Sequence, residues 1–165
     1  MFLKVSYMNR TRKITYLGMG IALYVVLSMT IKIPLINQIK TDFGYLAFGA
    51  FLNLFGMEAT IVGVAGCVIA NAFVGSAFPP GWVAGQLFIG LFCGYLLKKT
   101  DKIWMKALIC IAGVYIGIAA IKTVIECVLF RRPFEVKIIR NLVAFVADVI
   151  PMILGVFIGS KMKLK

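Results

Sequence analysis

Apolar stretches follow one another along almost the whole chain, and only short polar segments separate them. A membrane-spanning helix needs about 20 predominantly apolar residues, and six such helices with short turns would use all 165 residues. The chain is 62% hydrophobic with a mean hydropathy of +0.99, whereas soluble domains are roughly 45–50% apolar. A lone soluble domain could not bury that excess, so lipid must cover it. The sequence therefore predicts an integral membrane protein without a separate soluble catalytic domain.

Breaks in the apolar pattern divide this single transmembrane domain, residues 1–165, into an expected all-α bundle of six helices. A polar loop, a Met57–Glu58 turn, a Pro-Pro-Gly segment, a charged turn and an Arg-Arg-Pro segment separate the helices. Proline and glycine clusters end helices because proline lacks a backbone donor. The expected spans are 14–36, 43–56, 59–77, 82–97, 103–130 and 136–159.

The positive charges indicate the orientation of the chain. The net charge of +12 comes from 18 Lys and Arg against 6 Asp and Glu, and most of the positives lie between apolar stretches. This favours topogenic charge and contact with anionic lipid headgroups over nucleic-acid binding. Six spans would put both termini on one side, together with Lys4, Arg10, Arg12, Lys13, Lys98, Lys99, Lys102, Lys106, Lys161, Lys163 and Lys165. The positive-inside rule then predicts cytoplasmic termini in a multi-pass protein of the cell membrane.

The other side carries fewer positive charges, and four of them surround one loop. These residues are Lys32, Lys40, Arg131, Arg132, Lys137 and Arg140, and the last four flank the loop between the fifth and sixth spans. Attraction of an anionic ligand group would explain this cluster. Tolerance of a few charges, once other loops have fixed the topology, would explain it equally well.

Several kinds of chemistry lack the residues that they need. The chain has no histidine, no P-loop motif and no CxxC pair, and Cys67, Cys93, Cys110 and Cys127 all fall in apolar stretches. A metal site, a cofactor, a Ser-His-Asp triad and nucleotide hydrolysis are therefore not expected. An intramembrane aspartyl protease would need a second aspartate besides Asp148 well inside a span. We therefore predict that the protein is not an enzyme.

Four polar side chains in the last two spans are candidates for a function, because polar groups are costly in hydrocarbon. Lys122 and Glu126 share one face of the fifth span, and Asn141 and Asp148 share one face of the sixth. A rise of about 1.5 Å per residue predicts that antiparallel packing brings Lys122 near Asp148 and Glu126 near Asn141.

Two interpretations of these residues remain open. In the first, a Lys122–Asp148 ion pair merely holds the helices together. In the second, the polar residues line a pocket open to the outside, together with Asn71, Gln86 and Trp82, while Arg131 attracts an anionic group. Trp82 could stack on a flat ligand or serve as an interfacial anchor. The cytoplasmic halves of the spans offer few polar positions, which favours a binding cup over a channel.

Small residues recur four positions apart in several spans, which puts both on one helix face. The pairs are Gly18/Ala22, Gly66/Ala70, Gly81/Gly85, Gly90/Gly94, Gly113/Gly117 and Gly155/Gly159. Most of them are expected to pack the bundle, and one of them to face a partner.

Several segments together resemble a known family. They are the basic N-terminus, the first span over Leu17–Ser28, the polar outer loop, the Gly/Ala-rich stretch Ile61–Gly75, and Phe78-Pro-Pro-Gly-Trp82 leading into Gly85–Gly94. Over most of its length the chain resembles the substrate-binding S component of an energy-coupling factor (ECF) vitamin transporter. The first span and the Pro-Gly-Trp segment are most similar to the folate and pantothenate branches.

The resemblance implies partners and further site residues. In that family six helices bind a vitamin from outside, mainly through outer loops and the last three helices. A small-residue face on the first helix docks on a membrane coupling subunit driven by two ATPases. Gly18 and Ala22 match this face, although glycine replaces the usual first alanine. The outer loop, with Asn37, Gln38, Lys40 and Asp42, is implied to gate the pocket.

The expected function is therefore a high-affinity binding subunit of an ECF-type ABC importer, with the substrate left open. Lys122, Arg131 and Arg140 suit a carboxylate or phosphate, as in folate, pantothenate or lipoate. Glu126 and Asp148 suit a ligand that donates hydrogen bonds, such as a pyrimidine, pyridoxine or a deazapurine. The alternatives are a self-contained small carrier or channel, and a membrane assembly subunit that binds no ligand.

Overall fold

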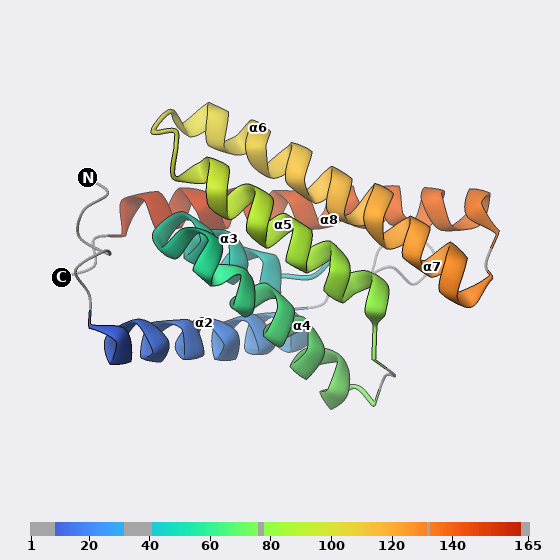
Figure 1. Ribbon diagram of the computed structural model, residues 1–165, viewed down its shortest axis with the longest axis horizontal. Coiled ribbons are helices and arrows are strands. Elements are labelled where there is room, and N and C mark those ends of the chain that lie inside the picture. Colours follow the sequence, from blue (N-terminus) through green and yellow to red (C-terminus); the bar gives the residue numbers. More distant parts are fainter. Residues whose placement is uncertain (1–8, 32–40, 76–77, 132, 163–165) are drawn as a thin grey trace.

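The computed structural model describes residues 9–31, 41–75, 78–131 and 133–162, and these residues form an all-helical bundle without strands (Figure 1). This confirms the all-α expectation. The elements are α2 (Arg10–Thr30), α3 (Gly44–Phe55), the 3-10 turn η2 (Gly56–Ala59), α4 (Thr60–Phe73), α5 (Pro80–Leu97), α6 (Ile103–Val114), the π-helical segment η3 (Tyr115–Lys122), α7 (Thr123–Phe130) and α8 (Phe134–Lys161).

Five helical stretches in the described residues are long and apolar enough to cross a membrane. They are α2, the combined stretch Gly44–Phe73, α5, the continuous stretch Ile103–Phe130, and α8. Within Gly44–Phe73, α3 ends at Gly56, whose φ of 66° lies in the left-handed region that glycine adopts readily. Figure 1 shows that the chain reverses at this turn, so that α3 and α4 run in opposite directions.

The helix starts and ends agree closely with the expected spans, with three exceptions. The first helix begins at Arg10, four residues before the expected start. The first helix ends at Thr30, because Ile31 is extended, and not at residue 36 as expected. A helix continuing to residue 36 would contain Pro34, which lacks a backbone donor and clashes with the preceding turn. The third expected span, 59–77, also ends early, at Phe73, and is followed by Gly75 with a φ of 67°.

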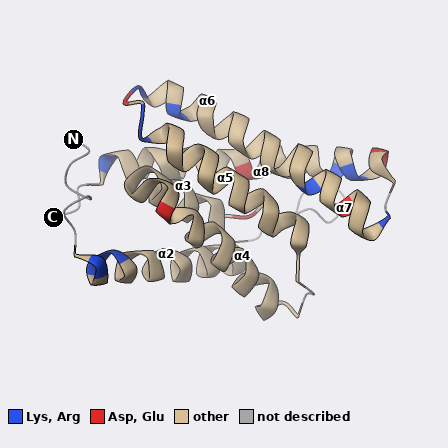
Figure 2. Cartoon of the chain, in the orientation of Figure 1, with Lys and Arg blue, Asp and Glu red and all other residues tan. Residues whose placement is uncertain are grey.

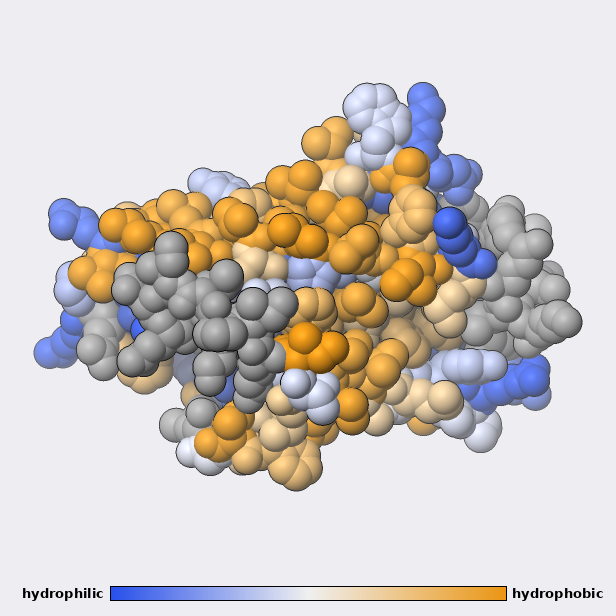
Figure 3. Space-filling model, turned by 180° about the vertical axis from the view of Figure 1, so that it is seen from behind, coloured by the Kyte–Doolittle hydropathy of each residue, from blue (hydrophilic) through white to orange (hydrophobic). Residues whose placement is uncertain are grey.

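The loops gather at two ends of the bundle. The start of α2, the end of α8, the α3–α4 turn and the α5–α6 turn lie at one end, here called the termini end (Figure 1). The ends of α4 and α7 lie at the other, here called the opposite end, and residues 41–43 lie beside the middle of α8. Figure 2 shows that Lys and Arg concentrate at the two ends, while the middle of the bundle is almost free of charge. The space-filling view shows a broad hydrophobic surface between the ends (Figure 3).

The core forms where α3 packs against α8, and glycines allow their backbones to approach closely. Eight of the twelve residues of α3 are buried. A Cβ at Gly155 would lie 2.0 Å from the carbonyl oxygen of Leu46, and one at Gly49 would lie 2.3 Å from that of Met152. Real Cβ atoms do not approach backbone this closely, so these positions accept no side chain.

The small-residue pairs divide as expected into packing pairs and one outward-facing pair. A Cβ added to the glycines of the other five pairs would meet atoms within 3.0 Å, as at Gly66, Gly85, Gly94 and Gly113. Gly18, in contrast, has nothing within 4 Å of such a Cβ, and both Gly18 and Ala22 are exposed. The outward-facing pair is thus the one on α2.

Candidate functional site

A cluster of polar side chains lies between α7 and α8 at the opposite end; we call it the lysine cluster. Glu126 Oε1 lies 3.6 Å from Lys122 Nζ, and Glu126 Oε2 lies 2.8 Å from Lys137 Nζ. Lys122 also donates a hydrogen bond to Asn141 Oδ1, and Asn141 Nδ2 donates to Thr123 Oγ1 over 2.8 Å. Lys122, Thr123 and Asn141 are buried, so the cluster satisfies charges and amides that would be costly without partners.

The backbone of η3 positions Lys122 in this cluster. Residues Tyr115–Lys122 adopt π-helical hydrogen bonding, which widens the helix and shifts the side chains that follow. Gly117 allows α5 to approach, since a Cβ there would lie 3.0 Å from the carbonyl oxygen of Gly85. The widened turn thus lies directly before the buried ammonium group, and such turns often mark functional sites.

Both expected pairings of these residues are wrong. Lys122 pairs with Glu126 and Asn141, and no ion pair joins it to Asp148 among the described residues. Glu126 pairs with Lys137 and Lys122, whereas Asn141 bonds to Lys122 and Thr123. The depth estimate assumed regular α-helices entering the membrane at equal levels. The π-helical segment and the relative shift of α7 and α8 instead match Lys122 with Asn141, two turns before Asp148.

A second group, which we call the Asp42 chain, joins four elements. Tyr24 OH donates to Asp42 Oδ2 over 3.0 Å, and Gln86 Nε2 donates to Tyr24 OH over 3.1 Å. The backbone N–H of Asp42 donates to Asp148 Oδ1 over 2.9 Å, and that of Gly44 donates to Asp42 Oδ1 over 2.8 Å. Asp42 therefore bonds to the first residue of α3 and to α2 and α8 directly, and it is connected to α5 through Tyr24.

A cavity of about 180 Å³ lies beside the Asp42 chain. Its described lining includes polar groups of Asp42 and Asn71 and the ring of Trp82, and the full set is Ser28, Met29, Thr41, Asp42, Cys67, Ala70, Asn71, Val74 and Trp82. Lys122 Nζ lies 4.0 Å from the centre of the Trp82 ring, a cation–π contact. Trp82 therefore connects the lysine cluster to the cavity, and an aromatic wall with nearby polar groups suits a small flat molecule.

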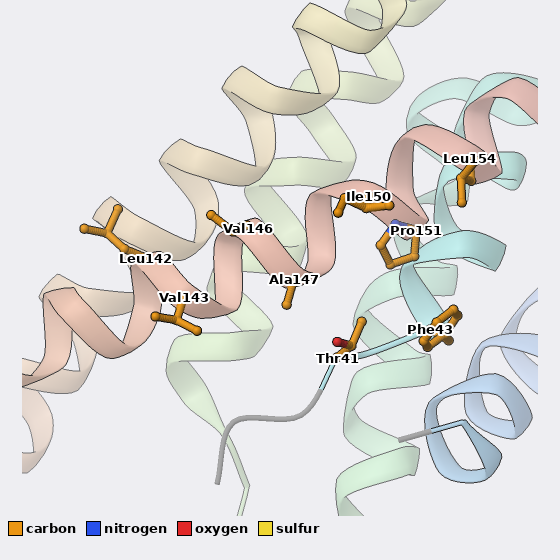
Figure 4. A pocket seen from close by; sticks show the side chains of 9 residues that line it. All are labelled: Thr41, Phe43, Leu142, Val143, Val146, Ala147, Ile150, Pro151 and Leu154. Carbon is orange, nitrogen blue, oxygen red and sulfur yellow. The ribbon is translucent and has the colours of Figure 1, made fainter. Parts of the chain in front are cut away.

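A larger apolar cavity of about 630 Å³ lies along α8, and Figure 4 shows its lining from α8 together with Thr41 and Phe43. Thr41 is the one polar side chain among the nine described lining residues. Leu142, Val146, Ile150 and Leu154 lie four apart on one exposed face of α8. This surface suits lipid, and a polar ligand would find few partners there, so the smaller cavity is the better candidate site.

The structure brings most of the candidate residues together, though in two groups. Lys122, Glu126 and Asn141 lie in the lysine cluster, while Gln86 and Asp148 belong to the Asp42 chain. Asn71 and Trp82 line the cavity. Arg131 is exposed at the end of α7 with a φ of 48°, and no contact with the site is found for it among the described residues. Of the four gating-loop residues, Asn37, Gln38 and Lys40 lie outside the described residues.

Sequence reasoning did not select several residues of the site, namely Tyr24, Thr123, Ser28 and Cys67, and it considered Lys137 only as part of the positive cluster around the loop before the sixth span. Lys137 precedes Asn141 by four positions and thus shares its helix face, which was an available signal. Tyr24 had no such signal, because one tyrosine in an apolar helix gives no indication of which loop its hydroxyl reaches.

A helical membrane bundle with a small, polar-walled site at one end is the architecture of a membrane-embedded substrate-binding subunit. Residues 8–163 match the family described as the S component of the ECF-type riboflavin transporter. The chain therefore belongs to this family of S components. It is a substrate-binding subunit of an ECF transporter and a multi-pass protein of the plasma membrane. The family comprises transporter components and is not a class of enzymes.

Individual proteins are also similar to this chain. The crystal structure of the S component for biotin from an ECF-type ABC transporter matches with a TM-score of 0.71 and 20% identity over 93% of each chain, which supports the fold. A UPF0397 protein of Streptococcus thermophilus is 23% identical over 158 residues, 89% of this chain and 87% of the relative. A UPF0397 protein of Lactococcus lactis subsp. cremoris is 29% identical over 95 residues, 56% of this chain and 52% of the relative.

The comparisons refine the sequence-based expectation. The S-component expectation is confirmed, and neither the self-contained carrier nor the assembly subunit without a ligand describes this family. The matching family model is the riboflavin one, whereas the sequence segments were most similar to the folate and pantothenate branches.

Proposed function

We propose that this chain captures a small vitamin-like molecule at the opposite end of the bundle and delivers it to an ATPase-driven coupling module. One observation supports this most strongly: Trp82 lines the 180 Å³ cavity and also contacts Lys122 of the lysine cluster. Buried charged and polar groups inside a membrane bundle are costly, and they are retained where they bind a ligand or another polar group.

The proposed topology has six spans with both termini in the cytoplasm. It is supported by the reversal of the chain at Gly56, which divides the stretch Gly44–Phe73 into two antiparallel helices. The positive charges support the orientation. Among the described residues the termini end carries Arg10, Arg12, Lys13, Lys98, Lys99, Lys102, Lys106 and Lys161, against Lys122, Arg131, Lys137 and Arg140 at the opposite end. The site would then open to the outside.

The proposed substrate is a flat, ring-containing molecule that packs on Trp82. Trp82 lines the cavity, and the Lys122 ammonium group lies 4.0 Å from the centre of its ring. Asp42 and Asn71 add polar groups to the wall. In the lysine cluster the ammonium groups of Lys122 and Lys137 both pair with the Glu126 carboxylate. The cluster therefore keeps a net charge of one positive unit, which suits a substrate with an electronegative edge. Given the family, riboflavin is the first compound to test.

Substrate capture is tested by purifying the chain in detergent, denaturing it and identifying the released molecules by mass spectrometry. We expect one ring-containing compound in a stoichiometric amount. A chain that carries no compound and binds neither riboflavin nor another vitamin would contradict the proposal. Uptake by the purified chain alone in liposomes, without ATP, would contradict the dependence on a coupling module.

Changing Gly18 or Ala22 to leucine is expected to weaken binding to the coupling module without unfolding the chain. The α2 face around these residues is flat and exposed, and a Cβ at Gly18 would meet nothing within 4 Å. Bulky side chains there would prevent the close backbone approach that small residues permit. We expect a loss of at least about tenfold in affinity, or about 1.4 kcal/mol.

The measurement is a titration of the purified module with each variant, with Met19→Leu as the control. Met19 is exposed on the same helix, and leucine has nearly the same volume. Unchanged affinity in both the Gly18→Leu and Ala22→Leu variants would show that another surface makes the contact.

A further inference from the structure

Helix α2 packs on the side of the bundle, and its partly buried side chains Tyr16, Leu17, Ile21 and Leu27 contact the core. Of its 21 residues, all of them described, only Gly20 and Tyr24 are buried. At the termini end, Lys13 Nζ lies 2.8 Å from Glu58 Oε2, but both side chains are partly exposed and such pairs contribute little. Gly20 and Tyr24 are thus the deepest contacts of α2, and Tyr24 adds hydrogen bonds to the apolar packing of its neighbours.

Tyr24 is the deeper of these two contacts and is fully buried. Two glycines make space for its ring: a Cβ at Gly44 would lie 2.8 Å from the ring, and one at Gly66 would lie 2.6 Å from it. The hydroxyl donates to Asp42 Oδ2 and accepts from Gln86 Nε2. The ring is thus enclosed by α3 and α4, and the hydroxyl is held in one direction.

The hydrogen bond of Tyr24 ends on the wall of the cavity. Asp42 lines the cavity, and its backbone is held by Asp148, which is itself buried. A change in the position of the Asp42 carboxylate therefore reaches α2 through one hydrogen bond, inside a bundle where water cannot readily replace the lost partner.

The exposed small-residue face lies on the other side of the same helix. Gly18 and Ala22 each precede a buried residue, Gly20 and Tyr24, by two positions, which is about 200° around a helix of 3.6 residues per turn. Tyr24 and the Gly18–Ala22 face thus lie on opposite sides of α2. Tyr24 reaches the cavity wall, and the Gly18–Ala22 face is proposed to dock.

We propose that Tyr24 is a positioning residue. It fixes the orientation of the Gly18–Ala22 face when the Asp42 carboxylate at the cavity wall accepts its hydrogen bond. This inference rests on the proposed docking of α2 on the coupling module. When the Tyr24–Asp42 bond is intact, the outer half of α2 is held in one orientation. When the bond is broken, α2 samples more orientations, and docking has to restrict them at a cost in affinity.

The test measures the affinity of the full-length chain, in lipid nanodiscs, for the purified module of coupling subunit and two ATPases. Tyr24→Phe keeps the ring and removes the hydroxyl. Asp42→Ala removes the acceptor without touching the docking face. A hydrogen bond to a charged group contributes about tenfold in an equilibrium constant, so Tyr24→Phe is expected to weaken module binding by about that factor.

The double variant tests whether the two residues act through their mutual bond. Asp42→Ala also removes the acceptor of the Gly44 N–H hydrogen bond, but this loss is present in both the single and the double variant and cancels in the cycle. We expect Tyr24→Phe to add no further loss in the Asp42→Ala background.

Tyr45→Phe is the matched control. Tyr45 is also fully buried, but its hydroxyl has no hydrogen-bond partner among the described residues. We expect its affinity for the module to equal that of the wild type. Size-exclusion profiles and melting temperatures of all the variants are measured in parallel, so that affinity is compared between folded proteins.

Each outcome discriminates between the proposals. A wild-type affinity for Tyr24→Phe, or losses that multiply in the double variant, would overturn the positioning role. If Gly18→Leu prevents module binding while Tyr24→Phe does not, the docking face stands and the positioning role fails. If the wild-type chain itself does not bind the module, the docking proposal fails and this inference fails with it.

Discussion

Replacing Gly155 by leucine is expected to leave no folded protein. A Cβ at this position would lie 2.0 Å from the carbonyl oxygen of Leu46 and 3.0 Å from the backbone nitrogen of Ala50. Overpacking a core costs about 1–3 kcal/mol even where side chains can move aside. Here the obstacle is backbone, so α3 and α8 would have to separate, and their contact forms the centre of the bundle.

The measurement is size-exclusion chromatography and thermal unfolding in detergent, with Gly18→Leu as the matched control. Gly18 also lies in a membrane-spanning helix, but it has open space around it. We expect the control to elute as a single species with the wild-type melting temperature, and the Gly155→Leu variant to aggregate. A monodisperse Gly155→Leu variant of wild-type stability would contradict the described crossing of α3 and α8.

Replacing Lys122 by methionine is expected to reduce substrate affinity by about tenfold to a hundredfold, since the lysine cluster loses the positive charge proposed to meet the substrate, and a hydrogen bond to a charged group contributes about 1.5–3 kcal/mol. Methionine keeps the length of the side chain and removes its charge. Asn141 then loses a donor, Glu126 retains Lys137, and Trp82 loses the ammonium group over its ring. The measurement is calorimetric titration with the compound released from the wild-type protein.

Lys106→Met is the matched control for this change. Lys106 is also a buried lysine bonded to an asparagine, since its Nζ donates to Asn53 Oδ1 over 2.7 Å, but it lies at the termini end. We expect the control to lose some stability and to keep its substrate affinity. An equal loss of affinity in both variants would indicate a general effect of buried lysines, and no loss in Lys122→Met would place the substrate elsewhere.

Much of the fold followed from the sequence, because the bilayer imposes strong rules on spanning helices. Span lengths, the positions of prolines and glycines, and apolar composition predicted helices that agree closely with α3, α5 and α8. The exceptions at Thr30 and Phe73 lie next to loops, where a few apolar residues can extend an expected span beyond the actual helix.

The candidate site was predicted in its parts but not in its connections. The cost of polar groups in lipid indicated Lys122, Glu126, Asn141 and Asp148 individually. It did not indicate that Lys122 bonds to Asn141, because a π-helical segment shifts the side chains relative to a regular helix. The role of Tyr24 could not be predicted either, since its partner Asp42 lies 18 residues away across a loop.

The sequence by itself determined that the chain is a helical membrane protein, where its helices break, and which polar side chains need an explanation. These properties depend on local composition and on the solvent, which act on each segment separately. Only the tertiary structure decided which small-residue faces are buried, which polar groups pair, and that one tyrosine on a peripheral helix reaches the wall of the cavity. Those properties depend on distances between helices, which are set jointly by the close contacts of all the segments.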